Sequence, residues 1–363
     1  MRVLVDIGHP GHVHLLKNVA KNLEKKGHKV YYSVRDIPVA KRLMDIYGMP
    51  YIDLGKKSDS IIGKAWTVIK QDILLFWYVI SHRIDMGLSS GIALPHVSRV
   101  THMKSFVFDD DDDDVEKFVV KYSHPYTNIV LSPSAVRDHR KTKNAIFYAG
   151  YHELAYLHPN VFQPDESVLD RLGIKKGEKY FVMRFVALKG HHDVGNKGLS
   201  FEQKKKLVEV LSQYGRVIIT GERKLEPEFE LYRMSVPAED MHSVMYYASL
   251  YIGDSQTMTS EAAVLGVPAL RCNTFVGRIS YLEEEEHQYG LTYGFTPDHF
   301  DQLLSKLHEM LAKPNLKKEW ADKRNKLLSE KINVSAFFTW FIENYPESKR
   351  VIEEDPDYQY NFK

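Results

Sequence analysis

Cysteine is nearly absent from this sequence, because Cys272 is the only one among 363 residues. A single cysteine excludes an internal disulfide framework and any zinc site built from several thiolates. An excess of charge of one sign is also lacking, since 49 Lys and Arg stand against 48 Asp and Glu for a formal net charge of +1. Without a basic field over the protein we expect no nucleic-acid partner.

Long apolar runs are missing as well. No stretch of the sequence reaches the roughly 20 apolar residues of a membrane-spanning helix. The first residues, MRVLVDIGHPGH, indicate a strand that runs into a polar turn and not a signal peptide. We therefore expect a cytoplasmic protein.

What the sequence does contain is a repeated alternation of short apolar strands with helical segments. The strands that we expect lie at 3–7, 29–34, 51–54, 85–88, 105–108, 129–131 and 146–149, and then at 181–186, 217–220, 250–252, 268–270 and 291–293. Apolar residues at helical spacing, such as Val13, Leu16 and Val19, lie between most of them. This alternation predicts an α/β protein with two doubly wound parallel sheets. The domains expected are 1–155, 156–335, and a terminal helix and tail at 336–363.

The segment 250–270, LYIGDSQTMTSEAAVLGVPAL, carries the strongest functional signal. It predicts a buried strand, a turn of small residues, a helix at 257–265 that ends at Gly266, and a second strand. Free backbone N–H groups and the positive dipole end at such a helix start attract phosphate. Glu261, one turn inside the helix, is placed to accept hydrogen bonds from a ribose diol. A nucleoside diphosphate is one interpretation, and a generic strand-turn-helix with a surface Glu261 is the other.

This segment resembles the donor-nucleotide motif of GT-B glycosyltransferases and of their relatives, the UDP-N-acetylglucosamine 2-epimerases. In that group a turn of small residues precedes a helix with a ribose-binding Glu, and a Gly-x-Pro turn follows. The matching positions here are 253–255, Glu261 and 266–268, whereas Asp254 stands where many relatives carry a neutral small residue. The resemblance implies a GT-B fold, with two Rossmann-like domains that face an active-site cleft. It also implies donor contacts from Ser255, Gln256 and Thr257.

The turn after the first expected strand, GHPGHVH at 8–14, is a second site of interest. Its Gly11-His12 pair resembles the Gly-Gly-His loop of GT-B enzymes of the lipid-linked N-acetylglucosaminyltransferase type, which implies that Gly11 lies near the donor phosphates. His12 would then stabilise the departing diphosphate, or His9 or His12 would deprotonate the acceptor hydroxyl as general base. Helix-capping histidines and a metal site are the alternatives.

A cation and two histidines follow the first strand of the second half, in RFVALKGHHD at 184–193. Arg184 is the best anion partner there, because a guanidinium can bind a diphosphate bidentately. An ion pair with an acid at the domain interface is the alternative. The further donor contacts expected are Lys189, His191, Arg223 and, by the resemblance, Met241 near the base pocket.

A run of six aspartates, Asp109 to Asp114, follows the expected strand at 105–108. Such runs are usually solvated loops. The position at the carboxyl end of a strand makes Asp109 a candidate catalytic base or acceptor contact, and a divalent cation is conceivable. The GT-B resemblance implies no bound metal and no cofactor, since helix dipoles and cations stabilise the leaving diphosphate.

Two aromatic segments bear on partners and on domain organisation. The segment 61–83 combines Trp66 and Trp77 with basic residues such as Arg83. A helix of this composition would contact a membrane surface, where a lipid-linked acceptor is found, and core packing is the alternative. The segment 336–345 either crosses back to the first domain, as in GT-B proteins, or packs on its own domain.

The residues and the resemblance together predict a metal-independent glycosyltransferase. It would move a sugar from a nucleotide-diphospho-sugar, UDP-linked, to a polysaccharide or lipid-linked acceptor. A UDP-N-acetylhexosamine 2-epimerase is the enzymatic alternative, because it shares the fold and the donor motif. A nucleotide-sugar-binding subunit without catalysis is the third interpretation.

Overall fold

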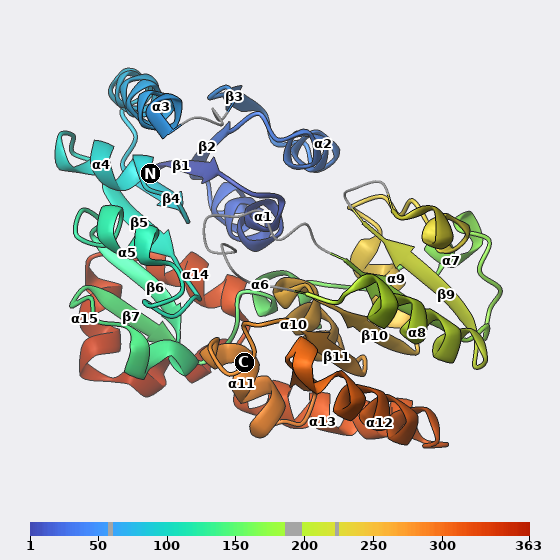
Figure 1. Ribbon diagram of the computed structural model, residues 1–363. Coiled ribbons are helices and arrows are strands. Elements are labelled where there is room, and N and C mark those ends of the chain that lie inside the picture. The colour runs from blue at the N-terminus through green and yellow to red at the C-terminus, as the bar shows by residue number, and fades with distance from the viewer. Residues whose placement is uncertain (57–60, 186–197, 222–224) are drawn as a thin grey trace. The chain divides into compact units, whose positions relative to one another are not determined.

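The computed structural model describes residues 1–56, 61–185, 198–221 and 225–363, and of residues 61, 62, 64 and 65 only the backbone. The chain divides into two compact units (Figure 1). Unit 1 combines Met1–Val161 with Lys331–Lys363, and unit 2 is Phe162–Glu330. Each unit is an α/β structure built on one parallel sheet.

The sheet of unit 1 has seven strands in the order β3-β2-β1-β4-β5-β6-β7, and every neighbouring pair is parallel. Its strands are β1 (Arg2–Ile7), β2 (Lys29–Val34), β3 (Tyr51–Asp53), β4 (Met86–Ser89), β5 (Lys104–Phe108), β6 (Ile129–Pro133) and β7 (Ala145–Tyr148). A strand covered on both faces is apolar along most of its length. β1 is such a strand, since every residue after Arg2 is buried.

Helices cover the sheet of unit 1 (Figure 1). They are α1 (Pro10–Lys25), α2 (Pro38–Ile46), α3 (Ile61–His82), α4 (Ala93–Arg99), α5 (Lys117–Tyr122), the 3-10 helix η1 (Ser134–His139) and α6 (Leu154–Leu157). α1 starts with a proline, whose missing N–H would have no partner in a first turn, and buries Val13, Leu16 and Val19. The Nδ2 of Asn18 in α1 donates to the carbonyl of Ala155 at 2.9 Å, which ties α6 to α1.

The last segment of the chain returns to unit 1. It consists of α14 (Val334–Glu343), α15 (Glu347–Glu354) and the 3-10 helix η4 (Pro356–Phe362). The ring of Phe338 in α14 lies 4.9 Å from that of Phe108 at the end of β5. The backbone N–H of Ile332 donates to the carbonyl of Ala149 at 2.9 Å. This bond attaches the segment to unit 1 a few residues before the expected start at 336.

The sheet of unit 2 has five parallel strands in the order β12-β11-β10-β8-β9. They are β8 (Tyr180–Arg184), β9 (Arg216–Thr220), β10 (Leu250–Gly253), β11 (Ala269–Cys272) and β12 (Thr292–Phe295). The helices are α7 (Ser167–Arg171), α8 (Phe201–Ser212), η2 (Pro227–Tyr232), α9 (Met241–Tyr247), α10 (Gln256–Leu265), α11 (Ser280–His287), η3 (Pro297–His299), α12 (Phe300–Leu311) and α13 (Leu316–Glu330). Each strand expected from the sequence is present, with ends shifted by no more than two residues.

Both sheets have a point where the winding changes direction. In unit 1 the chain leaves β1 for β2 on one side and later returns to β4 on the other. In unit 2 the corresponding neighbours are β8 and β10. Ligands of open α/β sheets bind outside the carboxyl ends of the strands at such switch points. The loops after β1 and β4, and those after β8 and β10, are therefore the places to look for sites.

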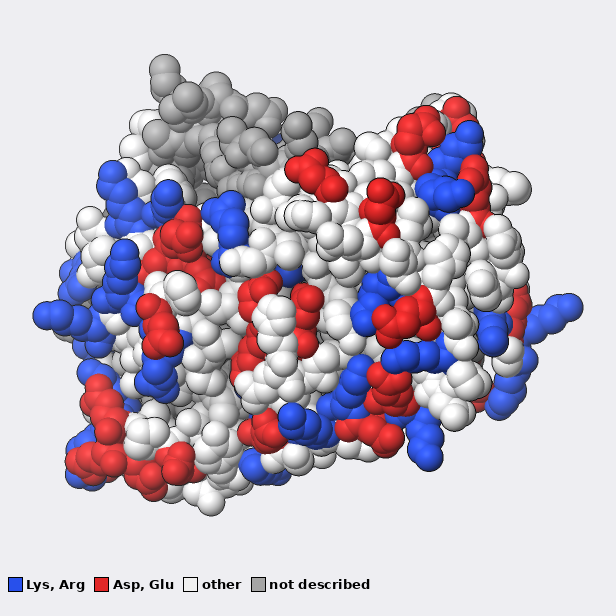
Figure 2. Space-filling model, turned by 60° about the horizontal axis from the view of Figure 1, so that its bottom comes forward, with Lys and Arg blue, Asp and Glu red and all other residues white. Residues whose placement is uncertain are grey.

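The surface carries charges of both signs. Lys and Arg are interspersed with Asp and Glu over the face shown in Figure 2, as the near-zero net charge implies. Among the helices described, none combines the length and the apolar character that crossing a membrane requires.

Candidate functional site

The turn between β10 and α10 lies at the switch point of unit 2, and its geometry depends on two small residues. Ser255 is the N-cap of α10, and its side chain accepts a hydrogen bond from the backbone N of Met258 at 3.3 Å. A Cβ at Gly253 would lie 2.4 Å from the carbonyl oxygen of Arg184 on the neighbouring strand, so only glycine fits there. Gly266 ends the helix with a left-handed φ of 75°.

Glu261 and His242 form a buried pair behind this turn. The Nε2 of His242, in α9, lies 2.9 Å from Oε1 of Glu261, in α10. The two side chains are only 6% and 9% exposed, so the contact is shielded from water. An imidazole beside one carboxylate oxygen fixes the rotamer of Glu261. The carboxylate is thus held at a defined position one turn inside the helix.

Arg184 ends one strand of the switch point, β8, and Asp254 directly follows the other, β10. Arg184 ends β8, is half-buried, and accepts a hydrogen bond from the backbone N of Asp254 at 3.2 Å. Asp254 is buried, and a Cβ at Gly198 would lie 2.5 Å from its Oδ2. Its carbonyl oxygen accepts from Nδ2 of Asn273 at 2.9 Å. The residue that departs from the family pattern is therefore packed into the unit, and its carboxylate is not the cap of α10.

Two of the remaining donor residues expected from the sequence, Gln256 and Thr257, lie in the first turn of α10. Gln256 is half-buried at the first position of α10, and Thr257 is exposed beside it. Met241 starts α9, next to the buried His242, and is half-buried. Lys189, His191 and Arg223 lie outside the residues that the structure describes.

The loop after β1 uses its histidines as backbone acceptors. His9 is the N-cap of α1, and its Nδ1 accepts from the backbone N of Gly11 at 3.1 Å. The Nδ1 of His12 accepts from the backbone N of Gly8 at 3.3 Å. Each neutral ring therefore carries its proton on Nε2, which makes it a hydrogen-bond donor. A ring in this tautomer suits contact with an anion better than deprotonation of an alcohol.

Asp109 has contacts that tie it to the fold. Its Oδ2 lies 2.8 Å from Nε2 of His124 and 3.0 Å from Nη1 of Arg140, and all three side chains are buried. Burial raises the pKa of Asp109, but the hydrogen bond from His124 and the charge of Arg140 outweigh it and hold the pKa below its ordinary value. Arg140 also binds Asp113 at 2.6 Å. The geometry favours a structural carboxylate at 109.

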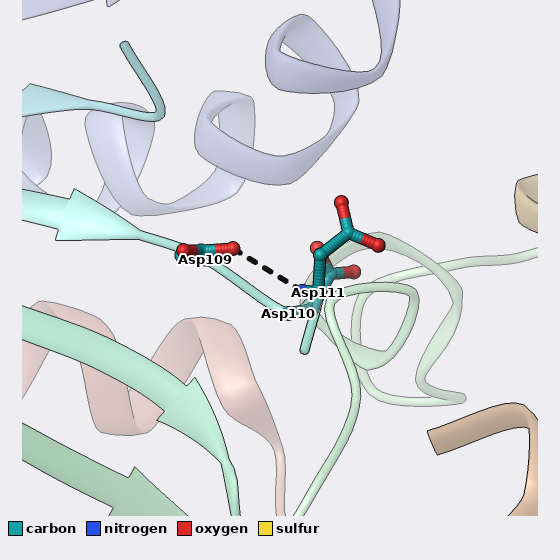
Figure 3. Close-up of side chains that lie close together, drawn as sticks. All are labelled: Asp109, Asp110 and Asp111. Atoms are coloured by element: carbon teal, nitrogen blue, oxygen red, sulfur yellow. Dashed lines mark hydrogen bonds between the residues drawn. The ribbon is translucent and has the colours of Figure 1, made fainter. Parts of the chain in front are cut away.

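The next two aspartates are less deeply buried. Asp110 is 24% exposed at its side chain, and its Oδ2 lies 3.0 Å from Nδ1 of His152. Burial, followed by the charges of Asp110 and Asp109, raises the pKa of Asp111 well above its ordinary value. Figure 3 shows the three side chains after β5, with the Asp109 carboxylate accepting from the Asp111 backbone N at 3.2 Å. One oxygen from each lies within 4.8 Å of the others, a spacing that could hold a metal ion.

Sequence reasoning missed the functional partners of the residues that it selected. His242 was visible only as a neighbour of Met241, because nothing in the spacing of 242 and 261 predicts a contact between two helices. Arg140 lies 31 residues from Asp109, yet its Nη2 donates to the carbonyl oxygens of Asp109 at 3.1 Å and Asp111 at 2.8 Å. Buried aspartates require a cation as a partner. A search of the sequence for that cation is the signal that could have pointed to Arg140.

Helix α3 exposes an apolar face instead of packing wholly into the core. Its exposed large side chains follow one another at helical spacing, at Trp66, Ile69, Ile73, Trp77 and Ile80, with Leu74 beside them. Its inner side, with Leu75 and Val79, packs against the core of unit 1. Core packing thus explains one face of the helix and leaves two tryptophans more than 60% exposed.

Solved structures similar to this one include sugar-nucleotide enzymes. The S. aureus MnaA–UDP co-structure is 10% identical, with a TM-score of 0.67 over 96% of this chain and 97% of that one. The Methanocaldococcus jannaschii UDP-GlcNAc 2-epimerase, in complex with UDP-GlcNAc and UDP, is 13% identical, with a TM-score of 0.63 over 89% and 99%. The Streptomyces sp. SF2575 glycosyltransferase SsfS6, complexed with thymidine diphosphate, is 12% identical, with a TM-score of 0.61 over 94% and 99%. These similarities confirm the predicted GT-B class of fold.

In sequence, the chain is 25% identical to the uncharacterized protein MJ0665 of Methanocaldococcus jannaschii. The alignment spans 305 residues, which are 78% of this chain and 86% of that protein. Residues 1–288 match the family described as "Protein of unknown function (DUF354)", and the chain belongs to that family.

Proposed function

We propose that unit 2 binds the nucleoside diphosphate of a UDP-linked sugar. The observation that carries this proposal is the buried pair of His242 and Glu261 behind the capped turn of α10. A carboxylate that an imidazole already holds in one rotamer can accept two hydrogen bonds from a ribose diol with little further loss of side-chain entropy. The free N–H groups at the start of α10 favour the adjacent phosphates.

The other donor contacts follow from position at the same switch point. Arg184 extends from the end of β8, one strand from the α10 turn, and would bind the diphosphate. Ser255, Gln256 and Thr257 provide the first-turn backbone, and Met241 would lie against the base. Lys189, His191 and Arg223 stay predictions from the sequence.

We propose a glycosyltransferase that moves this sugar to a polysaccharide or lipid-linked acceptor. In unit 1, His9 and His12 would donate from Nε2 to an anion, and Gly11 would leave the loop backbone accessible. The base is better assigned to Asp110 than to Asp109, since Asp110 is more exposed and its Oδ2 lies 3.0 Å from Nδ1 of His152. Asp109, with His124 and Arg140, would hold the strand end beside it.

A membrane-bound acceptor fits the apolar face of α3. Tryptophans on an amphipathic helix insert at the boundary between head groups and acyl chains. Trp66 and Trp77 occupy such positions, and Lys70 and Arg83 are exposed nearby on the helix and just after it. We propose that this face contacts the lipid surface that carries the acceptor.

A UDP-N-acetylhexosamine 2-epimerase is the second candidate. One of the similar solved structures is a UDP-GlcNAc 2-epimerase, and another is a complex with UDP. Incubation with UDP-N-acetylglucosamine alone separates the two functions. A transferase leaves the sugar nucleotide intact without an acceptor, apart from slow hydrolysis. Appearance of the 2-epimer, free or UDP-linked, would replace the transferase proposal with the epimerase.

The nucleotide proposal itself is tested with a panel of UDP-, TDP- and GDP-sugars monitored by thermal shift, because a ligand that binds only the folded state raises its stability. UDP-sugars should give the largest shift. Glu261→Gln should abolish that shift, whereas Glu228→Gln, at an exposed glutamate of unit 2, should keep it. Equal shifts in both variants would remove the proposed ribose contact. Tight binding without turnover of any donor would instead support a non-catalytic subunit.

A further inference from the structure

The switch point of the first sheet carries a row of buried polar groups that none of the roles above uses. Ser33, Asp6 and Ser89 are register partners on β2, β1 and β4, so their side chains lie on the same face of the sheet. The Oγ of Ser33 donates to Oδ1 of Asp6 at 2.8 Å. Ser89 is fully buried, yet its hydroxyl has no hydrogen-bond partner in the parts of the chain that the structure describes. Buried hydroxyls are normally satisfied.

The guanidinium group of an arginine lies next to this row. The Nε of Arg35, just after β2, is buried and unsatisfied among the described residues. The charge of Arg35 acts on Asp6, but the two side chains form no ion pair in the described structure. A buried guanidinium N–H that is left unpaired destabilises the protein without its ligand. An incoming acceptor of hydrogen bonds would remove this destabilisation.

Two glycines leave room beside the Arg35 guanidinium. A Cβ at Gly91, in the loop after β4, would lie 3.3 Å from Nη2 of Arg35 and 3.9 Å from Oδ2 of Asp6. A Cβ at Gly8, in the loop after β1, would lie 3.6 Å from Cζ of Arg35. Neither glycine has the positive φ that only glycine adopts easily. Their missing side chains therefore make space and do not serve the backbone.

The other groups around this space favour a negative ligand. The Oγ of Ser90, next to Gly91, is buried without a partner in the described structure. Helix α1 begins at Pro10 with no acidic residue in its first turn, so its positive dipole end is not neutralised there. Burial raises the pKa of Asp6, although the charge of Arg35 and the hydrogen bond from Ser33 oppose the rise.

We propose that Arg35 and Ser90 bind an oxyanion, a carboxylate or a phosphate, in the space that Gly8 and Gly91 leave open, and that this oxyanion belongs to the acceptor. A guanidinium binds either group through two parallel N–H···O bonds. The hydrogen bond from Ser33 holds Asp6 in place beside it. The binding of an oxyanion stands on these groups alone, and its assignment to the acceptor rests on the proposed transferase.

Calorimetric titration of the full chain with inorganic phosphate and with glucuronate tests the site. Saturating UDP is present, so that any phosphate site in unit 2 is filled. We expect one saturable site per chain. Arg35→Gln should weaken it by at least about tenfold, as expected for loss of hydrogen bonds to a charged group. Gly91→Ala should weaken it as well, because the new methyl group occupies the space beside Nη2. The stronger of the two ligands identifies the source as a phosphorylated or an acidic-sugar acceptor.

Lys25→Gln is the matched control, because it removes one exposed positive charge from α1 and should leave the titration unchanged. Circular dichroism and a UDP titration on each variant exclude loss of fold. Phosphate affinity equal to that of the wild type in Arg35→Gln would overturn the site. Phosphate binding that is seen without UDP and lost in saturating UDP would reassign the site to the donor. Failure of UDP to bind would sink the proposed function while leaving the anion titration interpretable.

Discussion

The imidazole of His242 lies 2.9 Å from the carboxylate of Glu261 and joins the first turn of α9 to the middle of α10. Sequence patterns single out the carboxylate but not its partner, and the partner determines where the carboxylate points. Replacement of His242 with Ala leaves a buried carboxylate without this hydrogen bond, which costs about 1–3 kcal/mol or more. We expect a lower free energy of unfolding in urea and weaker UDP binding. His242→Gln keeps a donor and should recover part of both, whereas equal UDP affinity in His242→Ala would contradict the role assigned to the pair.

Arg140 should be the most destabilising single site tested in unit 1. Its side chain is fully buried and bonds Asp109 and Asp113, so Arg140→Met leaves two buried carboxylates without their cation. Breaking a buried ion pair in this way costs about 3–5 kcal/mol. Urea unfolding measures the loss, and Lys143→Met, at an exposed lysine of the same unit, should change the free energy of unfolding by less than about 0.5 kcal/mol. A small loss in Arg140→Met would show that water replaces the guanidinium.

Asp111 should oppose folding at neutral pH. Its pKa in the folded protein is raised, mainly by burial and then by its acidic neighbours, so the folded state binds a proton more tightly than the unfolded state. The resulting penalty is absent below the unfolded pKa of about 3.9, grows as the pH rises, and is complete above the folded pKa. Asp111→Asn should therefore stabilise the protein at pH 7, and the gain should disappear near pH 4. Urea unfolding across this range checks the sign, and a gain independent of pH would contradict it.

The α3 face should bind vesicles that contain anionic lipid. The double variant Trp66→Ser, Trp77→Ser should co-sediment less with phosphatidylglycerol vesicles, because it lacks the two exposed tryptophans of this face. The blue shift of tryptophan fluorescence on vesicle binding should also disappear, because the remaining Trp320 is fully buried and Trp340 is half-buried. Leu231→Ser, at an apolar residue of unit 2 that is 86% exposed, is the control for a general loss of hydrophobic surface. Binding that the tryptophan variant retains would assign α3 to some other partner.

Cys272 should be inert in the folded protein. Burial, with the nearby charge of Asp254, raises the pKa of its thiol to about 12, so almost no reactive thiolate exists at pH 8. Ellman's reagent should detect no thiol in native protein and one thiol per chain in urea. Rapid labelling without denaturant would show that β11 opens locally.

The sequence predicts the fold well because its strands are buried on both faces. Val3, Leu4, Val5 and Ile7 of β1 are apolar because both faces of the strand are covered, and the same burial places β1 inside the sheet. Side-chain contacts over long separations leave no comparable pattern. The place of His9 and His12 after the first strand leaves two roles open, a base or a contact with the diphosphate, and only the observed bonds at Nδ1 favour donation from Nε2. Asp109 was selected for its place at a strand end, where its contacts with His124 and Arg140 depend on how three distant segments meet.

The return of residues 331–363 to unit 1 has a consequence for synthesis. Unit 2 is an insertion within unit 1, so it is one continuous piece of chain, and 162–330 is a rational fragment for separate expression. Unit 1 cannot complete its fold on the ribosome until the last helices emerge, because Phe338 supplies part of the core against Phe108. Until then the ends of β5 and β7 lack their cover, and a nascent chain halted before 331 would expose an apolar surface for chaperones to bind.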